Sequence, residues 1–323
     1  MTKQNESINI GLSVTHKPIP EGVRGGQKKY KAMKKLLIFA LVALGMLACT
    51  ESNAPKNAKE GALNGEFSVS ATKKVRFSQG NLQYKPIDNI WRFAEHQYDT
   101  IGAANENIAL DYKGWISLFG WGTGDNPLIY HSYDYDWEYF VDWGINKISN
   151  GGNKPNVWRT LTIGEWEYIF RFRPRAQLLF GMGSVNGIDG VIVLPDDWKG
   201  SEHKDFKSTI DQDIVWAGDD DLGVNFYYCN SDDGFESWIE NKYNSLSSSQ
   251  WSKMEKDGAV FLPAALLSDD YIQPYNHFGS YWSSTETRNS EYPNNISFGL
   301  FNLFFSGSYL SDRRSVRLVQ DVE

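Results

Sequence analysis

The chain has 323 residues, of which 41% are hydrophobic and 15% aromatic, enough apolar material for one large domain or two small ones. Its formal net charge is −8 at pH 7, and this excludes a general nucleic-acid-binding protein. Cys49 and Cys229 are too few for a disulfide framework. The many aromatic residues either fill the core of a loop-rich fold or line a carbohydrate- or protein-binding surface.

Residues 33–49 have the pattern of an export signal. A basic start at residues 33–35 leads into an apolar run that ends in Leu-Ala-Cys, and this run is too short to span a bilayer as a stable helix. The ending resembles the lipobox of bacterial lipoproteins, in which the cysteine is lipidated and becomes the new N-terminus. We therefore expect residues 1–32 to be a non-native or disordered extension, residues 33–48 to be a lipoprotein signal peptide and Cys49 to carry lipid. The alternative is a plain signal peptide with a chance cysteine.

Residues 49–64 are small, polar and charged with no hydrophobic period, which predicts a flexible tether. A tether behind a lipid anchor holds a folded domain away from the membrane. The folded domain is expected to occupy residues 65–323.

Short alternating segments bounded by turn residues predict antiparallel strands in the first part of this domain, and two apolar runs predict buried strands further on. These strands are expected at residues 66–69, 74–77, 80–84, 91–93, 191–194 and 259–263. Residues 130–139 interleave aromatic with acidic side chains. This segment either binds sugar by ring stacking and carboxylate hydrogen bonds or packs over its own domain.

Two helices are predicted. The first begins at Thr162, because Glu165 three residues later completes a capping-box pattern, and it ends before Pro174. The second covers residues 248–257 and ends at Gly258.

The last fifty residues have strand-forming sequence at both ends, residues 281–282 and residues 315–319. The part between them is rich in Asn, Gly and Ser, which predicts hairpins and loops. We expect the two ends to form a frame that carries the intervening polar and aromatic residues on its surface.

Three segments of the domain have distinctive sequences: Trp-Arg-Thr-Leu-Thr-Ile-Gly-Glu-Trp-Glu-Tyr at 158–168, Gly-Ser-Tyr-Trp-Ser-Ser-Thr at 279–285 and Arg-Ser-Val-Arg-Leu-Val at 314–319. Together they resemble bacterial C-type-lectin-like domains of the formylglycine-generating-enzyme (sulfatase-modifying factor) and major paralogous domain branch. The resemblance covers roughly residues 65–322. It implies a loop-rich α+β fold, with a twisted antiparallel sheet flanked by two helices and with the first and last strands side by side.

The chemistry of the enzyme branch is not expected here. Formylglycine-generating enzymes use a cysteine pair near the C-terminal end, and the corresponding stretch of this chain has none, so we predict no catalytic residues. Gln273-Pro274-Tyr275 lacks the carboxylate of the calcium-binding motif of animal lectins. No cofactor is expected. The acidic runs at 219–221 and 232–234 either hold a structural calcium ion or are solvated loops.

The resemblance favours a non-catalytic lipoprotein at the outer membrane or cell surface of a Gram-negative bacterium, which binds a protein or glycan and functions in adhesion. One alternative is a glycan-acting or divergent formylglycine-generating-type enzyme, and another is a structural surface or appendage component. Tyr, Asn and Arg are common binding-surface residues, and Trp282 beside them is expected in the core. The candidate ligand-binding residues are Tyr281, Arg288, Asn289, Tyr292, Asn294, Asn295, Asn302, Tyr309 and Arg313.

Overall fold

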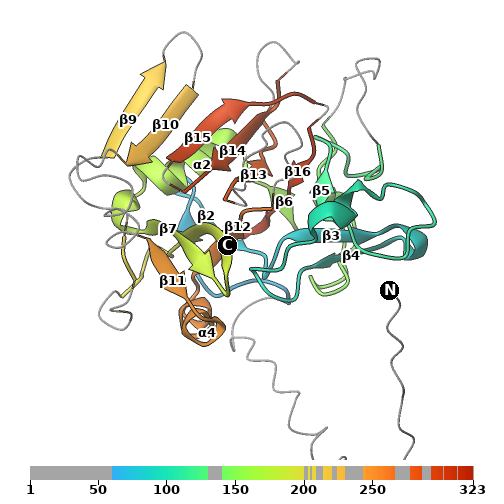
Figure 1. Ribbon diagram of the computed structural model, residues 1–323, viewed down its shortest axis with the longest axis horizontal. Coiled ribbons are helices and arrows are strands. Elements are labelled where there is room, and N and C mark those ends of the chain that lie inside the picture. The colour runs from blue at the N-terminus through green and yellow to red at the C-terminus, as the bar shows by residue number, and fades with distance from the viewer. Residues whose placement is uncertain are drawn as a thin grey trace, which may run out of the picture. The chain divides into compact units, whose positions relative to one another are not determined.

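The structure is a computed structural model. It describes residues 60–129, 140–199, 203, 206–208, 214–219, 224–229, 243–265, 277–285, 292–300, 302–310 and 312–322. The predicted extension, the signal peptide, Cys49, most of the tether and the aromatic–acidic segment at 130–139 lie outside these residues. The described part is α+β, with many strands and two short α-helices (Figure 1).

The first sheet joins the beginning of the domain to its end. Its strands are β1 (Phe67–Ser68), β2 (Lys74–Phe77), β17 (Leu318–Asp321) and β6 (Arg159–Thr160), in the order β1-β2-β17-β6. The β2–β17 pair is antiparallel, with Phe77 opposite Val319. The prediction that the N- and C-terminal strands lie near each other is therefore confirmed, with β2 rather than β1 as the direct neighbour of β17.

The largest sheet has seven strands and contains the segment that was expected to carry the binding surface. Its order is β5 (Leu118–Phe119), β16 (Arg314–Ser315), β13 (Gly279–Trp282), β14 (Asn294–Phe298), β15 (Asn302–Gly307), β10 (Val224–Cys229) and β9 (Ile214–Asp219). In Figure 1 the hairpin of β14 and β15 lies between β13 and β10. The predicted strand at 315–319 is instead two strands, because the chain leaves this sheet after Ser315 and joins the first sheet at Leu318.

Two further sheets complete the described part. One has the order β11 (Asn244–Leu246), β7 (Phe180–Val185), β8 (Ile188–Val193) and β12 (Val260–Pro263), and the other pairs β3 (Leu82–Lys85) with β4 (Ile90–Phe93). The expectation of one antiparallel sheet is too simple, because the described strands form four sheets and β11 runs parallel to β7.

Both predicted helices are present, and local contacts explain where they begin. Helix α2 (Ile163–Glu167) has the predicted capping box between Thr162 and Glu165, and it continues as a π-helical turn, Tyr168–Phe172. Helix α4 (Ser248–Lys256) is capped in the same way by Ser247. Gly258 follows it with a φ of 93°, a left-handed conformation that glycine adopts without strain. None of the described helices has the length and apolar character needed to cross a membrane.

Most of the described tryptophans belong to the core, which supports the core alternative for those aromatic residues. Trp166, Trp282 and Trp251 each lie in one of three buried apolar clusters. The Trp282 indole nitrogen also donates to the carbonyl of Phe119 at 2.7 Å. Since Trp282 is buried, its expected core position is confirmed.

A buried polar network connects the beginning of the domain to its last strands. The Arg317 guanidinium donates to Oε1 of Gln97 at 2.5 Å and to Oδ1 of Asn81 at 3.4 Å. Asn81 in turn donates to the hydroxyl of Tyr281 at 2.9 Å. Burial lowers the pKa of Arg317 to about 10, although Tyr281 and Glu255 offset part of the shift. The cation is therefore charged at neutral pH in the middle of the fold.

Asp196, which is half-buried, is the centre of a second polar network. Its carboxylate pairs with Arg173 at 3.2 Å and accepts hydrogen bonds from the backbone and hydroxyl of Ser68 at 3.0 and 2.6 Å. Burial acts to raise the pKa of Asp196, but the hydrogen bonds from Ser68 and the charge of Arg173 outweigh it, so this pKa lies below its ordinary value. Burial also lowers the pKa of Arg173 to about 10. Asp196 thus fastens β1 to the end of the first helix.

Candidate functional site

Two tyrosines from the predicted binding surface lie together and are open to solvent. Tyr292 is 40% exposed and Tyr309 is 56% exposed. Their ring centroids are 5.3 Å apart, and the ring planes are inclined by 60°. We call these two rings the tyrosine pair.

The β14–β15 hairpin fixes the tyrosine pair, because Tyr292 shortly precedes β14 and Tyr309 follows β15. Asn294 of β14 is opposite Gly307 of β15, and the amide of Ser308 donates to the carbonyl of residue 293 at 3.1 Å. A Cβ atom at Gly307 would lie 2.8 Å from the Cβ of Tyr292. The glycine therefore permits the close approach of the two segments that carry the rings.

The other asparagines of the predicted surface do not form one group with the tyrosine pair. Asn294 is half-buried and begins β14, close to Tyr292 in sequence. Asn302 is also half-buried, but it begins β15 at the other end of the hairpin. There its backbone carbonyl accepts a hydrogen bond from the Gly299 amide at 2.9 Å. The hairpin thus separates Asn302 from the tyrosine pair.

The expected surface positions of Tyr281 and Asn295 are wrong, since both side chains are buried. The Tyr281 hydroxyl donates to the carbonyl of Pro263 at 3.0 Å while it accepts from Asn81, and burial raises its pKa. The Asn295 amide donates to the carbonyl of Ser306 at 3.0 Å and to the hydroxyl of Ser308. Internal partners satisfy these polar groups, so they can be buried at little cost.

Arg313 is half-buried, and its guanidinium holds backbone together. It donates to the carbonyls of Asn105 at 2.5 Å and Leu118 at 2.6 Å. These bonds favour a structural role over a role in ligand contact. Arg288 and Asn289 lie outside the described residues.

A trio of titratable side chains, which the sequence analysis did not identify, lies where three segments meet. The Asp189 carboxylate accepts a hydrogen bond from the Tyr243 hydroxyl and is bonded to Nδ1 of His277. Burial is the main reason that the pKa of Tyr243 is raised, and Asp189 adds to the effect. The three residues come from β8, the start of the β11 segment and the residues before β13, so no local motif could indicate them.

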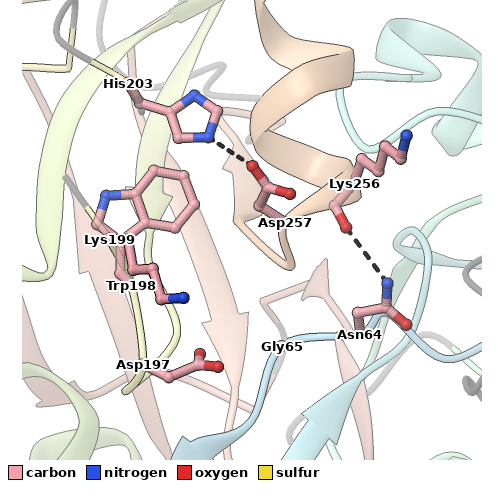
Figure 2. Close-up of a pocket in the computed structure, with 8 residues that line it drawn as sticks. All are labelled: Asn64, Gly65, Asp197, Trp198, Lys199, His203, Lys256 and Asp257. Carbon is pink, nitrogen blue, oxygen red and sulfur yellow. Dashed lines mark hydrogen bonds and ion pairs between the residues drawn. The ribbon is translucent and has the colours of Figure 1, made fainter. Parts of the chain in front are cut away.

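A pocket at the C-terminal end of α4 is the second place with several converging polar groups (Figure 2). Its volume is about 290 Å³. Nε2 of His203 lies 2.6 Å from Oδ2 of Asp257, and the His203 ring stacks on Trp198 with centroids 4.6 Å apart. The pocket is lined by Asn64, Gly65, Asp197, Trp198, Lys199, His203, Lys256 and Asp257.

Close backbone contact forms one side of this pocket. A Cβ atom at Gly65 would lie 2.4 Å from the carbonyl oxygen of Gly258, so only glycine fits at Gly65 without movement. The Asn64 amide donates to the carbonyl of Lys256 at 3.2 Å (Figure 2). The segment before β1 is thereby held against the end of α4.

Metal binding has no support within the described residues, where no group of three or more His, Cys, Asp or Glu side chains is arranged to hold an ion. The acidic runs at 219–221 and 232–234 lie outside this statement, because only the backbone of Asp219 is described. Residues 273–275 are outside the described part, and of Cys229 only the backbone in β10 is described.

No protein-family model, no curated protein and no solved structure matches this chain.

Proposed function

We propose that this protein is a non-catalytic binding protein, anchored by lipid at Cys49 on the outer membrane or cell surface, whose protein or glycan ligand contacts the tyrosine pair. The observation that carries the proposal is the exposure of two adjacent tyrosine rings beside the open end of the β14–β15 hairpin. Tyrosine supplies a large contact area and a hydroxyl at a low ordering cost, and it is enriched among residues that dominate binding energy.

The burial of the strands near the tyrosine pair favours the same proposal. Trp282 and Phe298, which belong to β13 and β14, are fully or almost fully buried, so the strands that position the rings are fixed in the core. A rigid platform reduces the entropy that is lost when a ligand binds. Sugar rings and apolar protein side chains both pack well on exposed aromatic faces.

A C-type-lectin-like frame is the finer fold that we propose. The pairing of β2 with β17 agrees with a fold in which the chain ends close on each other. The β14–β15 hairpin, which lies between β13 and β16 in the sequence, agrees with a frame that carries a displayed surface.

The test of the binding site uses the full chain on an array of glycans and surface proteins. We expect a Tyr292→Ala/Tyr309→Ala double variant to lose binding, since hot-spot tyrosines each contribute about 2 kcal/mol or more. Its unfolding free energy should change by no more than about 1 kcal/mol, because both side chains are exposed.

The matched control is Leu110→Ala, which removes another exposed apolar side chain from a different segment. This control should bind like the wild type. If the double variant binds its array target with unchanged affinity, the tyrosine pair is not the site.

The anchor is tested separately by growing cells with an alkyne-labelled fatty acid. The wild-type chain should become labelled and fractionate with membranes, and a Cys49→Ala variant should do neither. Label on the Cys49→Ala variant would rule out Cys49 as the lipid attachment point.

The Asp189–Tyr243–His277 trio supports a second candidate function, a glycan-acting enzyme. A carboxylate bonded to one imidazole nitrogen is the arrangement that orients histidine for general acid–base catalysis. Incubation with polysaccharides and measurement of new reducing ends tests this candidate. Activity that a His277→Ala variant loses would favour the enzyme, and the absence of any product from the wild type would exclude glycan hydrolysis on those substrates.

A further inference from the structure

The pocket at the C-terminal end of α4 contains two opposite charges that protein partners do not neutralise. Asp197 and Lys199 are both exposed, and within the described part of the chain neither side chain has an ion-pair or hydrogen-bond partner. In Figure 2 the Asp197 carboxylate and the Lys199 ammonium point toward the middle of the pocket. By contrast, the adjacent Asp196 is fully engaged with Ser68 and Arg173.

Other polar groups of the pocket already bond to one another. Asp257 is bonded to His203, and the Asn64 amide is bonded to the Lys256 carbonyl. The Lys256 ammonium points away from the pocket (Figure 2). Asp197 and Lys199 are therefore the carboxylate and the ammonium group that point into the pocket without a partner among the described residues.

We propose that this pocket binds a small zwitterion, a molecule with one ammonium and one carboxylate group, such as a free amino acid. Its ammonium group pairs with Asp197 and its carboxylate pairs with Lys199. This site is separate from the tyrosine pair and does not depend on the function proposed for that surface.

The charges of the pocket favour a zwitterion over other small ligands. The unpaired carboxylate of Asp197 and the negative end of the α4 dipole oppose a multiply charged anion such as phosphate. A simple cation would leave Lys199 unpaired beside it, whereas a zwitterion satisfies both charges at once.

The size of the pocket agrees with this ligand class. A volume of about 290 Å³ lies at the lower end of the range for small-molecule sites, which favours a ligand smaller than a typical drug. The stacked rings of Trp198 and His203 form one wall. That wall offers apolar and polar surface to the part of the ligand between its two charges.

The experiment is isothermal titration calorimetry of the full chain with L-alanine and L-leucine, a smaller and a larger probe. The N-acetyl derivative of each probe lacks the ammonium group, and the amide derivative lacks the carboxylate. We expect saturable binding of at least one amino acid and about tenfold or greater weakening for both derivatives, which corresponds to the loss of one ion pair. These derivatives also represent the C-terminus and the N-terminus of a peptide, so they separate a free amino acid from a peptide end.

Two variants test the assigned residues. Asp197→Asn and Lys199→Met should each weaken binding of the amino acid by about tenfold or more. Lys256→Met is the matched control, because it removes the same charge from the same pocket lining but from an ammonium group that points away. The control should bind like the wild type, and so should the Tyr292→Ala/Tyr309→Ala variant.

Three results would overturn the proposal. They are the absence of saturable binding for both probes, equal binding of a parent probe and its derivatives, and unchanged affinity in both Asp197→Asn and Lys199→Met.

Discussion

An Asp196→Asn substitution removes the charge that faces the buried guanidinium of Arg173. The Arg173 side chain is 0% exposed, and its other acceptors are the carbonyls of Ile169 at 2.7 Å and Leu179 at 3.2 Å. Removal of one partner from a buried pair costs about 3–5 kcal/mol, because the other charge stays buried without compensation. Asp196 is itself 21% exposed and asparagine keeps one oxygen acceptor, so we expect a loss of about 3 kcal/mol at pH 7.

The assay is urea and thermal unfolding of the full chain, followed by tryptophan fluorescence. A loss of about 3 kcal/mol should lower Tm by about 6–12 °C for a domain of this size class. Asp197→Asn is the matched control, since it makes the same change at the next residue, on an exposed side chain. The control should stay within about 0.5 kcal/mol of the wild type.

The effect should also depend on pH, because the pKa of Asp196 is lowered in the folded state. A carboxyl group with a lowered folded pKa contributes stability that is present above its unfolded pKa, about 3.9, and is lost as the pH falls through the folded pKa. The difference between wild type and Asp196→Asn should therefore be largest at neutral pH and should shrink below about pH 4. A difference that is equally large at pH 7 and in strong acid, or a neutral-pH loss below about 0.5 kcal/mol, would refute this reasoning.

Three further stability predictions use the same unfolding measurements. Gly164→Ala should stabilise the protein by about 0.5–1 kcal/mol, because Gly164 lies in an exposed helical turn and no atom lies within 4 Å of the new Cβ. Gly144→Ala should destabilise the protein by about 1–3 kcal/mol or more, because its Cβ would lie 1.8 Å from the Trp158 carbonyl oxygen. Equal effects of the two variants on the free energy of unfolding would contradict the steric argument. Val316→Asp places a charge at a position with 0% exposure and should cost more than about 4 kcal/mol, so a folded variant at wild-type Tm would show that Val316 is not core. Tyr281→Phe should cost about 1–3 kcal/mol because it leaves two buried partners unpaired, and a neutral result would mean that water replaces the hydroxyl.

The sequence predicted features that depend on a few neighbouring residues. The Thr162–Glu165 capping box and the glycine stop after α4 are contacts within one turn, so their residue types are sufficient to identify them. The proximity of the N- and C-terminal strands was predicted from a family resemblance, and the pairing of β2 with β17 confirms it.

Burial of polar residues could not be predicted in the same way. Tyr281 and Asn81 are 200 positions apart, and their hydrogen bond is what permits the tyrosine to be buried. The pocket at the C-terminal end of α4 could not be predicted from the sequence either. Its lining comes from separate segments, and His203 and Asp257 have no sequence motif in common. Contacts between residues far apart in the sequence determine both the burial of Tyr281 and the formation of the pocket, and amino-acid composition does not specify such contacts.

The central position of β17 in the first sheet also determines when this domain can fold. Strands β1 and β2 are synthesised early, but an isolated two-stranded hairpin is marginal in water, and β2 obtains its second neighbour only when residues 318–321 leave the ribosome. The Arg317–Asn81 contact, which spans 236 positions, also cannot form until Arg317 has been synthesised. Such distant contacts make folding slow, because a long loop must close before they form. The first sheet therefore cannot be completed before residues 318–321 have been synthesised, and until then the edge of β2 that pairs with β17 is available to other strands.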